Sequence, residues 1–195
     1  MEELNLRYLC ALLGIFLLLA ANASAGSFKV DMDVDTYVDA NNANQSYNDD
    51  DLLWATSESG KPVKEVYLSF INLFGSQSIF KPEQILSATL ELDAADVEKA
   101  GKITAYFLHG ATFGTVAWND KLDYDSKVSS SSVDVDKEGS YTLDVSPIIK
   151  NAVEACPEGC PYSIVIVAED GASVGFTSSE ASDEKKPILE YITAE

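Results

Sequence analysis

Short segments in which apolar and polar residues alternate recur along most of this chain. The first runs from Phe28 to Val34, where every second residue is apolar and the residues between are charged. Because successive side chains of a β-strand point to opposite faces, this pattern is typical of a strand with one buried and one solvated face. Turn-forming residues separate the further candidates, which lie at 52–56, 66–70, 86–92, 103–108, 115–118, 133–135, 141–145, 163–167, 174–177 and 188–192.

One segment has the pattern of a helix. Ser146 is a suitable N-cap, Pro147 suits the first helical position, and an apolar run follows up to Cys156. Many short strands and a single short helix predict an all-β fold, and we expect a jelly-roll β-sandwich. No internal repeat or linker divides residues 26–195, so we expect them to form one domain.

The first 25 residues have the features of a secretory signal peptide. The apolar run from Tyr8 to Ala21 is shorter than the roughly 20 residues that a membrane-spanning helix needs. Small residues, Ala23 and Ala25, follow it at the positions that a signal peptidase requires. We therefore expect cleavage after Ala25, a secreted or cell-surface location and no membrane span in the mature chain. An uncleaved anchor or a buried core helix is the alternative.

A secreted protein can form disulfides and can be glycosylated, which concerns the cysteines and one asparagine of this chain. Cleavage leaves only Cys156 and Cys160, which an oxidising compartment would pair in a disulfide. A metal site would need further Cys or His ligands, and the only histidine, His109, is distant in sequence. Asn44 begins a glycosylation sequon, which is used only in a host that has the machinery.

The charge balance excludes whole classes of partner. The chain has 32 acidic and 13 basic residues, for a net charge of −19, and its only arginine, Arg7, lies in the expected signal peptide. Such a protein is repelled by nucleic acid and by anionic lipid surfaces. The same repulsion makes a polyanionic sugar a poor ligand, so a neutral glycan is favoured.

Several motifs follow one another in an order typical of a known family. The most specific is the strand sequence ILSATLEL at 85–92; the others lie at 35–38, 44–47, 67–70, 116–119, 141–146, 176–180 and 187–191. Together they resemble the DNRLRE-type domain, a group of secreted proteins that includes disaggregatase-related proteins and some carbohydrate-binding modules. The resemblance spans about residues 33–192. It implies a β-sandwich that acts as a binding or surface module and does not imply an enzyme.

One position departs from the family pattern. The family commonly has arginine just before the glutamate that matches Glu180, and this chain has Ser179. If that arginine normally pairs with a buried carboxylate, an acid is left uncompensated here, or a lysine or a metal compensates it.

Clusters of aspartate make calcium a candidate ligand. Oxygen ligands from carboxylates and loop carbonyls suit Ca²⁺ better than zinc, which prefers Cys and His. The alternative is a solvated acidic face, because no EF-hand spacing is present. The candidate ligands are Asp31, Asp33 and Asp35 in the first strand and Asp49, Asp50 and Asp51 in a loop.

Aromatic residues in loops are the candidates for sugar binding. A flat ring can cover the apolar face of a pyranose while Asp and Asn side chains bind its hydroxyls. Trp118 beside Asn119 fits best, and Tyr47 and Tyr124 are further candidates. Trp54 lies in an apolar stretch and is expected to be buried. For every one of these rings a core position is the alternative.

No catalytic motif stands out. His109 has no nucleophile motif around it, and among so many acids a pair of carboxylates indicates nothing. The sequence thus predicts a secreted, non-catalytic module that binds a neutral polysaccharide or cell-surface glycan, with Ca²⁺ as a candidate stabilising ion. The alternative is a homo-oligomeric filament, sheath or surface-layer subunit, assembled by donation of strand 28–34 and by calcium bridging.

Overall fold

The computed structural model describes residues 26–30, 32–111, 115–181 and 185–194, so the expected signal peptide lies outside the described residues. Within them the chain forms twelve strands, one α-helix and four short 3-10 turns, which confirms the predicted all-β class. The strands are β1 (Gly26–Val30), β2 (Met32–Asp39), β3 (Leu52–Glu58), β4 (Lys61–Ile71), β5 (Ile85–Lys99), β6 (Gly101–His109), β7 (Asp125–Ser129), β8 (Val133–Val135), β9 (Gly139–Asp144), β10 (Pro161–Glu169), β11 (Ser173–Thr177) and β12 (Ile188–Thr193). The helix is α2 (Ser146–Ala155), and the turns are η1 (Ala40–Asn42), η2 (Phe74–Gln77), η3 (Pro82–Gln84) and η4 (Trp118–Asp120).

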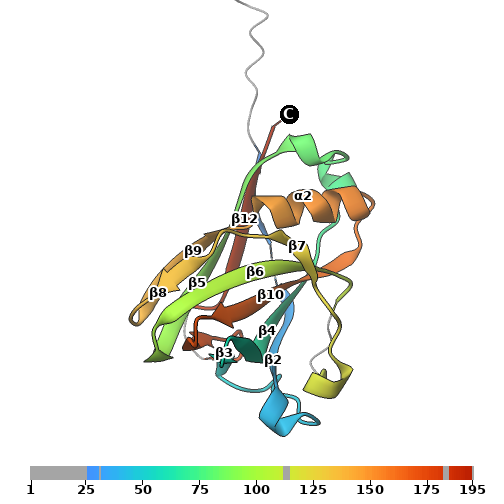
Figure 1. Ribbon diagram of the computed structural model, residues 1–195. Helices are drawn as coiled ribbons and strands as arrows, with labels where there is room; N and C mark the ends of the chain where they lie inside the picture. The colour runs from blue at the N-terminus through green and yellow to red at the C-terminus, as the bar shows by residue number, and fades with distance from the viewer. Residues whose placement is uncertain (1–25, 31, 112–114, 182–184, 195) are drawn as a thin grey trace, which may run out of the picture.

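Antiparallel pairing joins the strands into one curled sheet, in the order β1-β12-β5-β11-β3-β4-β10-β6-β7. β2 pairs with β4, β9 with β5, and β8 with β6. The curl places β12, β5 and β9 opposite β4, β10 and β6, and their inward side chains share one hydrophobic core (Figure 1). The molecule is therefore a sandwich of two layers that are continuous at one edge.

Long strands make this continuity possible. β4 pairs with β3 through its first residues, up to Lys64, and with β2 from Lys64 to Phe70. β5 likewise pairs with β12 through its first half and with β11 through its second half. β2 therefore lies on one edge of β4, whereas β3 and then β10 occupy the other edge, and β3 with β11 forms the corner between the layers.

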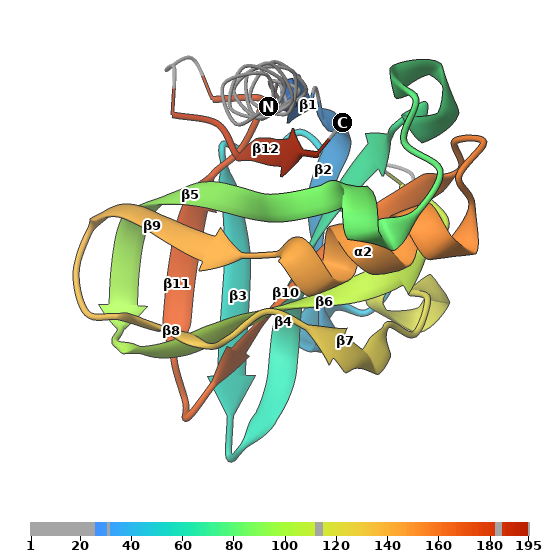
Figure 2. The same cartoon turned by 90° about the horizontal axis from the view of Figure 1, so that it is seen from above.

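The helix covers the gap between the layers. α2 lies between β5 and β6 (Figure 2) and buries its apolar side chains Ile148, Ile149 and Val153. No helix in the described part of the chain has the length and apolarity that a membrane crossing needs.

The predicted disulfide between Cys156 and Cys160 is present just after the helix, with the two Cα atoms 5.6 Å apart. Gly159, inside this loop, has a positive φ of 103°. A Cβ at Gly159 would lie 2.8 Å from the carbonyl oxygen of Asn72, so the loop needs glycine to lie against the end of β4. The disulfide loop is thus part of the packed structure.

The predicted first strand is wrong in one respect, because it is two strands in different layers. β1 pairs with β12 and β2 pairs with β4, so these two neighbouring strands belong to different layers. A two-residue period persists through such a change of layer, so the alternation did not reveal it. The predicted strand at 115–118 is also wrong, since Trp118 begins the turn η4. β7 was missed because its sequence, DSKVS, is mostly polar.

Candidate functional site

The outer face of the layer formed by β2, β4, β10 and β6 carries a second hydrophobic cluster. Buried side chains from these strands, including Tyr67 and Val165, form it, and the segment after β6 folds back over it. Trp118 and Tyr124 come from this segment and pack against the cluster. Tyr124 stacks on Tyr106 with ring centroids 4.7 Å apart. Two of the predicted sugar-binding residues thus lie where the chain covers its own sheet.

A buried carboxylate fixes that covering segment. Glu65 on β4 is only 2 % exposed, and it accepts hydrogen bonds from the Tyr67 hydroxyl (3.0 Å) and from Lys121 Nζ (2.7 Å). Lys121 Nζ also lies 4.3 Å from the centroid of the Trp118 ring. Burial and the nearby charge of Glu65 raise the pKa of Tyr67 far above its usual range, and burial above all raises the pKa of Tyr124 to about 12. The Trp118 ring therefore contacts Lys121 and packs against the hydrophobic cluster beneath it.

Tyr47, a third predicted sugar-binding residue, is buried. It is 9 % exposed, and its ring stacks on Tyr37 with centroids 4.2 Å apart. A ring covered in this way is not available as a platform for a sugar.

Trp54 is only partly buried, contrary to the expectation that it lies wholly in the core. It projects from β3 opposite Gly175 of β11. A Cβ at Gly175 would lie 3.1–3.3 Å from three atoms of the Trp54 ring, so the ring faces the strand backbone at close range. A side chain at position 175 would push the ring away. The absence of a side chain at this position lets the Trp54 ring, which is partly buried and packs against the main core, lie over the backbone of β11.

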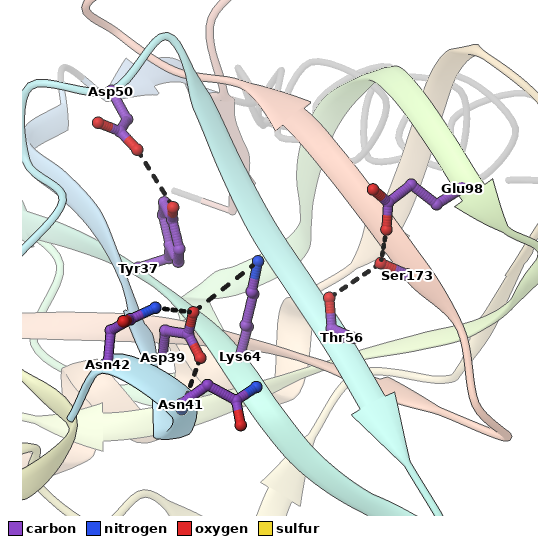
Figure 3. A network of polar contacts seen from close by, with 9 residues as sticks. All are labelled: Tyr37, Asp39, Asn41, Asn42, Asp50, Thr56, Lys64, Glu98 and Ser173. Carbon is purple, nitrogen blue, oxygen red and sulfur yellow. Dashed lines mark hydrogen bonds and ion pairs between the residues drawn. The ribbon is translucent and has the colours of Figure 1, made fainter.

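Polar groups lie on one side of this ring, between β2 and β3. Lys64 Nζ is 5.3 Å from the Trp54 ring centroid and 4.0 Å from Asp39 Oδ2. The Asp39 carboxylate accepts hydrogen bonds from the Asn41 backbone N–H (2.8 Å) and from Asn42 Nδ2 (3.1 Å). These residues occupy the left of Figure 3, where the Tyr37 hydroxyl also donates to Asp50 (3.1 Å).

A second polar group continues the row from Lys64 to its paired residue Thr56 and on to Ser173, at the right of Figure 3. The hydroxyls of Thr56 and Ser173 are 3.0 Å apart, and Ser173 donates to Glu98 Oε2 (2.8 Å). These three side chains help to line a hollow of about 420 Å³. Thr56 and Trp54 are two residues apart on β3, so they share one face of the strand, roughly 7 Å apart. The polar groups thus form one row across four strands, next to the ring, that runs from Asp39 through Lys64 and Thr56 to Ser173.

The loop that contains η1 forms a neighbouring hollow of about 540 Å³, lined only by residues 41–45. Its exposed side chains are almost all carboxamides. Asn119, a predicted ligand residue, donates from Nδ2 to Asn44 Oδ1 (2.8 Å) and from its backbone N–H to the carbonyl of Ala43 (3.0 Å). The structure thus places Asn119 and the sequon asparagine side by side and brings η4 against the η1 loop.

The predicted calcium ligands are only partly brought together. Asp33, Asp35 and Asp49 line a pocket of about 380 Å³, together with Glu180. Asp50 is turned toward Tyr37, Asp51 is exposed, and Asp31 lies outside the described residues. Among the residues that the structure describes, no three acidic, Cys or His side chains are placed to hold a metal ion.

Ser179, at the position of the family's arginine, contacts a buried carboxylate. Asp35 is 3 % exposed and accepts hydrogen bonds from the backbone N–H (2.7 Å) and the hydroxyl (2.8 Å) of Ser179. Burial raises the pKa of Asp35, and the two hydrogen bonds from Ser179 only partly oppose this rise. The acid at this position therefore has a neutral partner.

The sequence from residue 27 to residue 193 matches the model of carbohydrate-binding module family 96. The chain belongs to that family. Its members are binding modules rather than catalytic domains, which supports the carbohydrate-binding part of the resemblance found in the motifs; the DNRLRE-type label stays a prediction. No curated protein matches the module.

Sequence reasoning considered Trp54, expected it to be buried and favoured Trp118 as the sugar-binding ring, whereas the structure leaves Trp54 partly exposed. A signal was present in Gly175, because a glycine inside a strand often marks the close approach of another group. The sequence did not show that this group is Trp54, since the two residues are far apart along the chain.

Proposed function

We propose that the module binds a neutral polysaccharide or cell-surface glycan, without catalysis, on the open outer face around Trp54. The observation that carries this proposal is the Trp54 ring lying against Gly175 with a row of polar groups beside it. An aromatic ring covers the apolar face of a pyranose, and carboxylates and hydroxyls beside it bind the sugar hydroxyls. Membership of a carbohydrate-binding family supports this proposal.

The charges around the ring favour a neutral sugar. Asp50 and Glu98 lie near the site, Asp39 is buried beside it, and Lys64 is the cation that approaches the ring. Carboxylates accept hydrogen bonds from hydroxyls, whereas they repel the acid groups of a polyanion. The net charge of −19 adds to this repulsion at longer range.

Affinity electrophoresis in gels that contain hydroxyethyl cellulose, glucomannan, xylan or alginate tests the proposal. We expect at least one neutral polysaccharide to retard the module and alginate to leave it unretarded. Trp54→Ala should abolish the retardation, and the control Trp118→Phe should retain it. Migration unaffected by every neutral polysaccharide, or equal retardation of Trp54→Ala and wild type, would contradict the proposal.

We further propose that the module is secreted after removal of residues 1–25. The disulfide between Cys156 and Cys160 supports this location, because such bonds persist in oxidising compartments. Mass spectrometry of the protein recovered from the medium should show Gly26 as the first residue.

Calcium binding is a separate proposal, supported by the four acidic side chains around the pocket at Asp35. Carboxylate oxygens suit Ca²⁺, and a cation there would relieve their mutual repulsion. We expect millimolar calcium to raise the melting temperature relative to chelator and Asp33→Asn to reduce that rise. Equal melting in calcium and in chelator would remove the proposal.

The alternative function is a filament or surface-layer subunit. β1 supports it, because it lies at the end of the sheet order and is hydrogen-bonded to β12 alone among the described strands. However, Phe28 stacks on Tyr191 at 5.3 Å, so β1 already completes its own sandwich. Deletion of residues 26–30 removes β1 and spares β2. Calcium-promoted assembly of the intact module that this deletion abolishes would favour the filament, and monomers at every concentration would exclude it.

A further inference from the structure

We propose that two copies of the module associate through the end of the sandwich at which β4 and β12 end and β5 begins. Large apolar side chains that are 41–60 % exposed gather at this apolar end. It carries five of the six such side chains in the described part of the chain, namely Ile71, Leu73, Phe80, Leu86 and Ile192. The sixth, Leu122, lies elsewhere, in the segment between η4 and β7.

Gln84 joins the segments that form the apolar end. Its side chain accepts a hydrogen bond from the Phe80 backbone N–H (2.8 Å), and its carbonyl accepts one from Ala194 (2.8 Å), just after β12. Ile192 of β12 is paired with the residue that follows Leu86 on β5. The segment between β4 and β5 and the end of β12 therefore lie together, at the top of Figure 1 and seen from above in Figure 2.

The disulfide loop fixes the other part of the apolar end. A Cβ at Gly159 would lie 2.9 Å from Leu73 Cδ2, so the loop is in close contact with this side chain. A Cβ at Gly75 would lie 3.1 Å from the Pro157 carbonyl oxygen and 3.4 Å from the Phe80 ring. The apolar side chains are thus carried by segments that are bonded and packed together, so little order has to be gained on binding.

The size of the apolar end suits the centre of a protein interface. A specific interface buries about 800 Å² on each partner, with an apolar centre and a polar rim. Five large apolar side chains, each roughly half exposed, supply on the order of 400 Å² per copy, about half of that area. Apolar patches of this size with a polar rim mark interaction sites on soluble proteins.

The charges at the rim favour a second copy as the partner. Lys81, Glu83 and Glu158 are exposed there, and none of them takes part in an ion pair among the described residues. In a two-fold dimer every contact occurs twice, so Lys81 of each copy can meet an acid of the other. The net charge of −19 opposes an anionic lipid surface as the partner, and two copies repel least where the surface is apolar.

Such a dimer points the glycan-binding faces of its two copies away from each other. Ile71 is the last residue of β4, whereas Lys64, beside the Trp54 ring, lies near its start, about 23 Å away along the strand. The blue η1 turn lies at the far end of the molecule in Figure 1. A dimer can therefore cross-link polysaccharide chains or bind one chain with avidity. This consequence rests on the proposed function, whereas the dimer itself does not.

Sedimentation equilibrium from low to high micromolar concentration tests the dimer. We expect wild type to approach twice the monomer mass. Phe80→Gln/Leu86→Gln removes the two most exposed apolar side chains and should raise the dissociation constant at least about tenfold, with an unchanged melting temperature. Leu122→Gln is the matched control, because it removes an exposed apolar side chain outside the apolar end, and it should dimerise as wild type does.

A second pair of variants tests the rim. Lys81→Glu should weaken the dimer, whereas Lys61→Glu, which makes the same charge change at the opposite end of β4, should not. Wild type that stays monomeric at every concentration would overturn the inference, as would dimerisation of Phe80→Gln/Leu86→Gln equal to that of wild type. Monomeric wild type that floats with phosphatidylcholine vesicles would assign the apolar end to a neutral lipid surface and would also overturn it.

Cross-linking separates the inference from the proposed function. Wild type should turn a solution of the polysaccharide that retards it turbid. Phe80→Gln/Leu86→Gln should still be retarded by that polysaccharide but should leave the solution clear, and equal turbidity would contradict binding by a dimer. The proposed function fails in a different way, through a dimer that no polysaccharide retards.

Discussion

Two places in the molecule each combine a tryptophan, a lysine and a carboxylate, and the two groups differ in how closely they are joined. Lys121 Nζ lies 4.3 Å from the Trp118 ring centroid and 2.7 Å from Glu65. Lys64 Nζ lies 5.3 Å from the Trp54 ring centroid and 4.0 Å from Asp39. The same residue types thus form a tight clamp in one place and an open surface in the other.

Both carboxylates are buried, Glu65 to 2 % and Asp39 to 4 % exposed, and their hydrogen-bond partners make the difference. Glu65 is covered by the segment that carries Lys121, so its charge depends on the lysine and on Tyr67. Asp39 is bonded by the η1 loop through Asn41 and Asn42, so it does not depend on Lys64. The first group holds a loop on a sheet, whereas in the second the η1 loop holds the carboxylate and the lysine approaches it only to 4.0 Å.

Removal of Lys121 should give the largest change in the free energy of unfolding. Lys121→Ala leaves the buried Glu65 carboxylate without a cation, and we expect it to lower the free energy of unfolding by about 3 kcal/mol. Lys64→Ala removes a longer, more exposed contact and should cost less than about 1 kcal/mol. Urea denaturation of both variants measures the two values.

The control is the double variant Glu65→Gln/Lys121→Ala, which removes both charges and should recover part of the loss. Equal destabilisation by Lys121→Ala and Lys64→Ala would break the distinction between the two groups.

A substitution beneath the open ring should act on binding more than on stability. In Gly175→Val the new side chain meets the Trp54 ring at its Cβ, and the ring must move. We expect the affinity for a neutral polysaccharide to fall about tenfold, because the platform is displaced, at a cost of about 1 kcal/mol in stability. Calorimetric binding together with urea denaturation separates the two effects.

The matched substitution on the covered side is Trp118→Phe, which changes the clamp and leaves the Trp54 face intact. Its affinity should stay within twofold of wild type. A larger affinity loss in Trp118→Phe than in Gly175→Val would indicate that the sugar binds near Trp118 and would contradict a site around Trp54.

The smallest effect is expected at Asp35, a buried acid whose partner is Ser179 rather than a lysine. Burial raises its pKa above the usual value of 3.8, so the folded protein holds this proton more tightly than the unfolded chain does. The contribution of Asp35 to stability therefore falls as pH rises through its folded pKa. In chelator, Asp35→Asn should raise the melting temperature at pH 7, and the difference should shrink toward pH 4. An equal or lower melting temperature at pH 7 would contradict this reading.

Alternation in the sequence predicted most strands and the fold class. The cap residues predicted the helix, and the two remaining cysteines predicted the disulfide. All of these depend on local pattern and spacing. The covering of one outer face was not predicted, although β10 carries a hint. Its apolar run from Ile164 to Ala168 has no polar face, which is typical of a strand buried on both sides. Which segment provides the cover depends on contacts between distant residues, such as Lys121 with Glu65.

The candidate site was less predictable for a similar reason. Trp54 stands among apolar residues in the sequence, and only the pairing of β3 with β11 shows that it lies outside, over Gly175. The predicted Asn119 lies beside the hollow of the η1 loop, because η4 docks on that loop. The ring and the carboxamides come together only after the sheet has curled.

The most direct test of the account uses the two tryptophans of the chain as separate reporters. Trp118→Phe leaves Trp54 as the sole indole, and Trp54→Phe leaves Trp118. Each variant is titrated with the neutral polysaccharide that retards the wild type, while tryptophan fluorescence is recorded. The account predicts a saturable change in emission in Trp118→Phe and a flat signal in Trp54→Phe. A saturable change in Trp54→Phe with a flat signal in Trp118→Phe would contradict it.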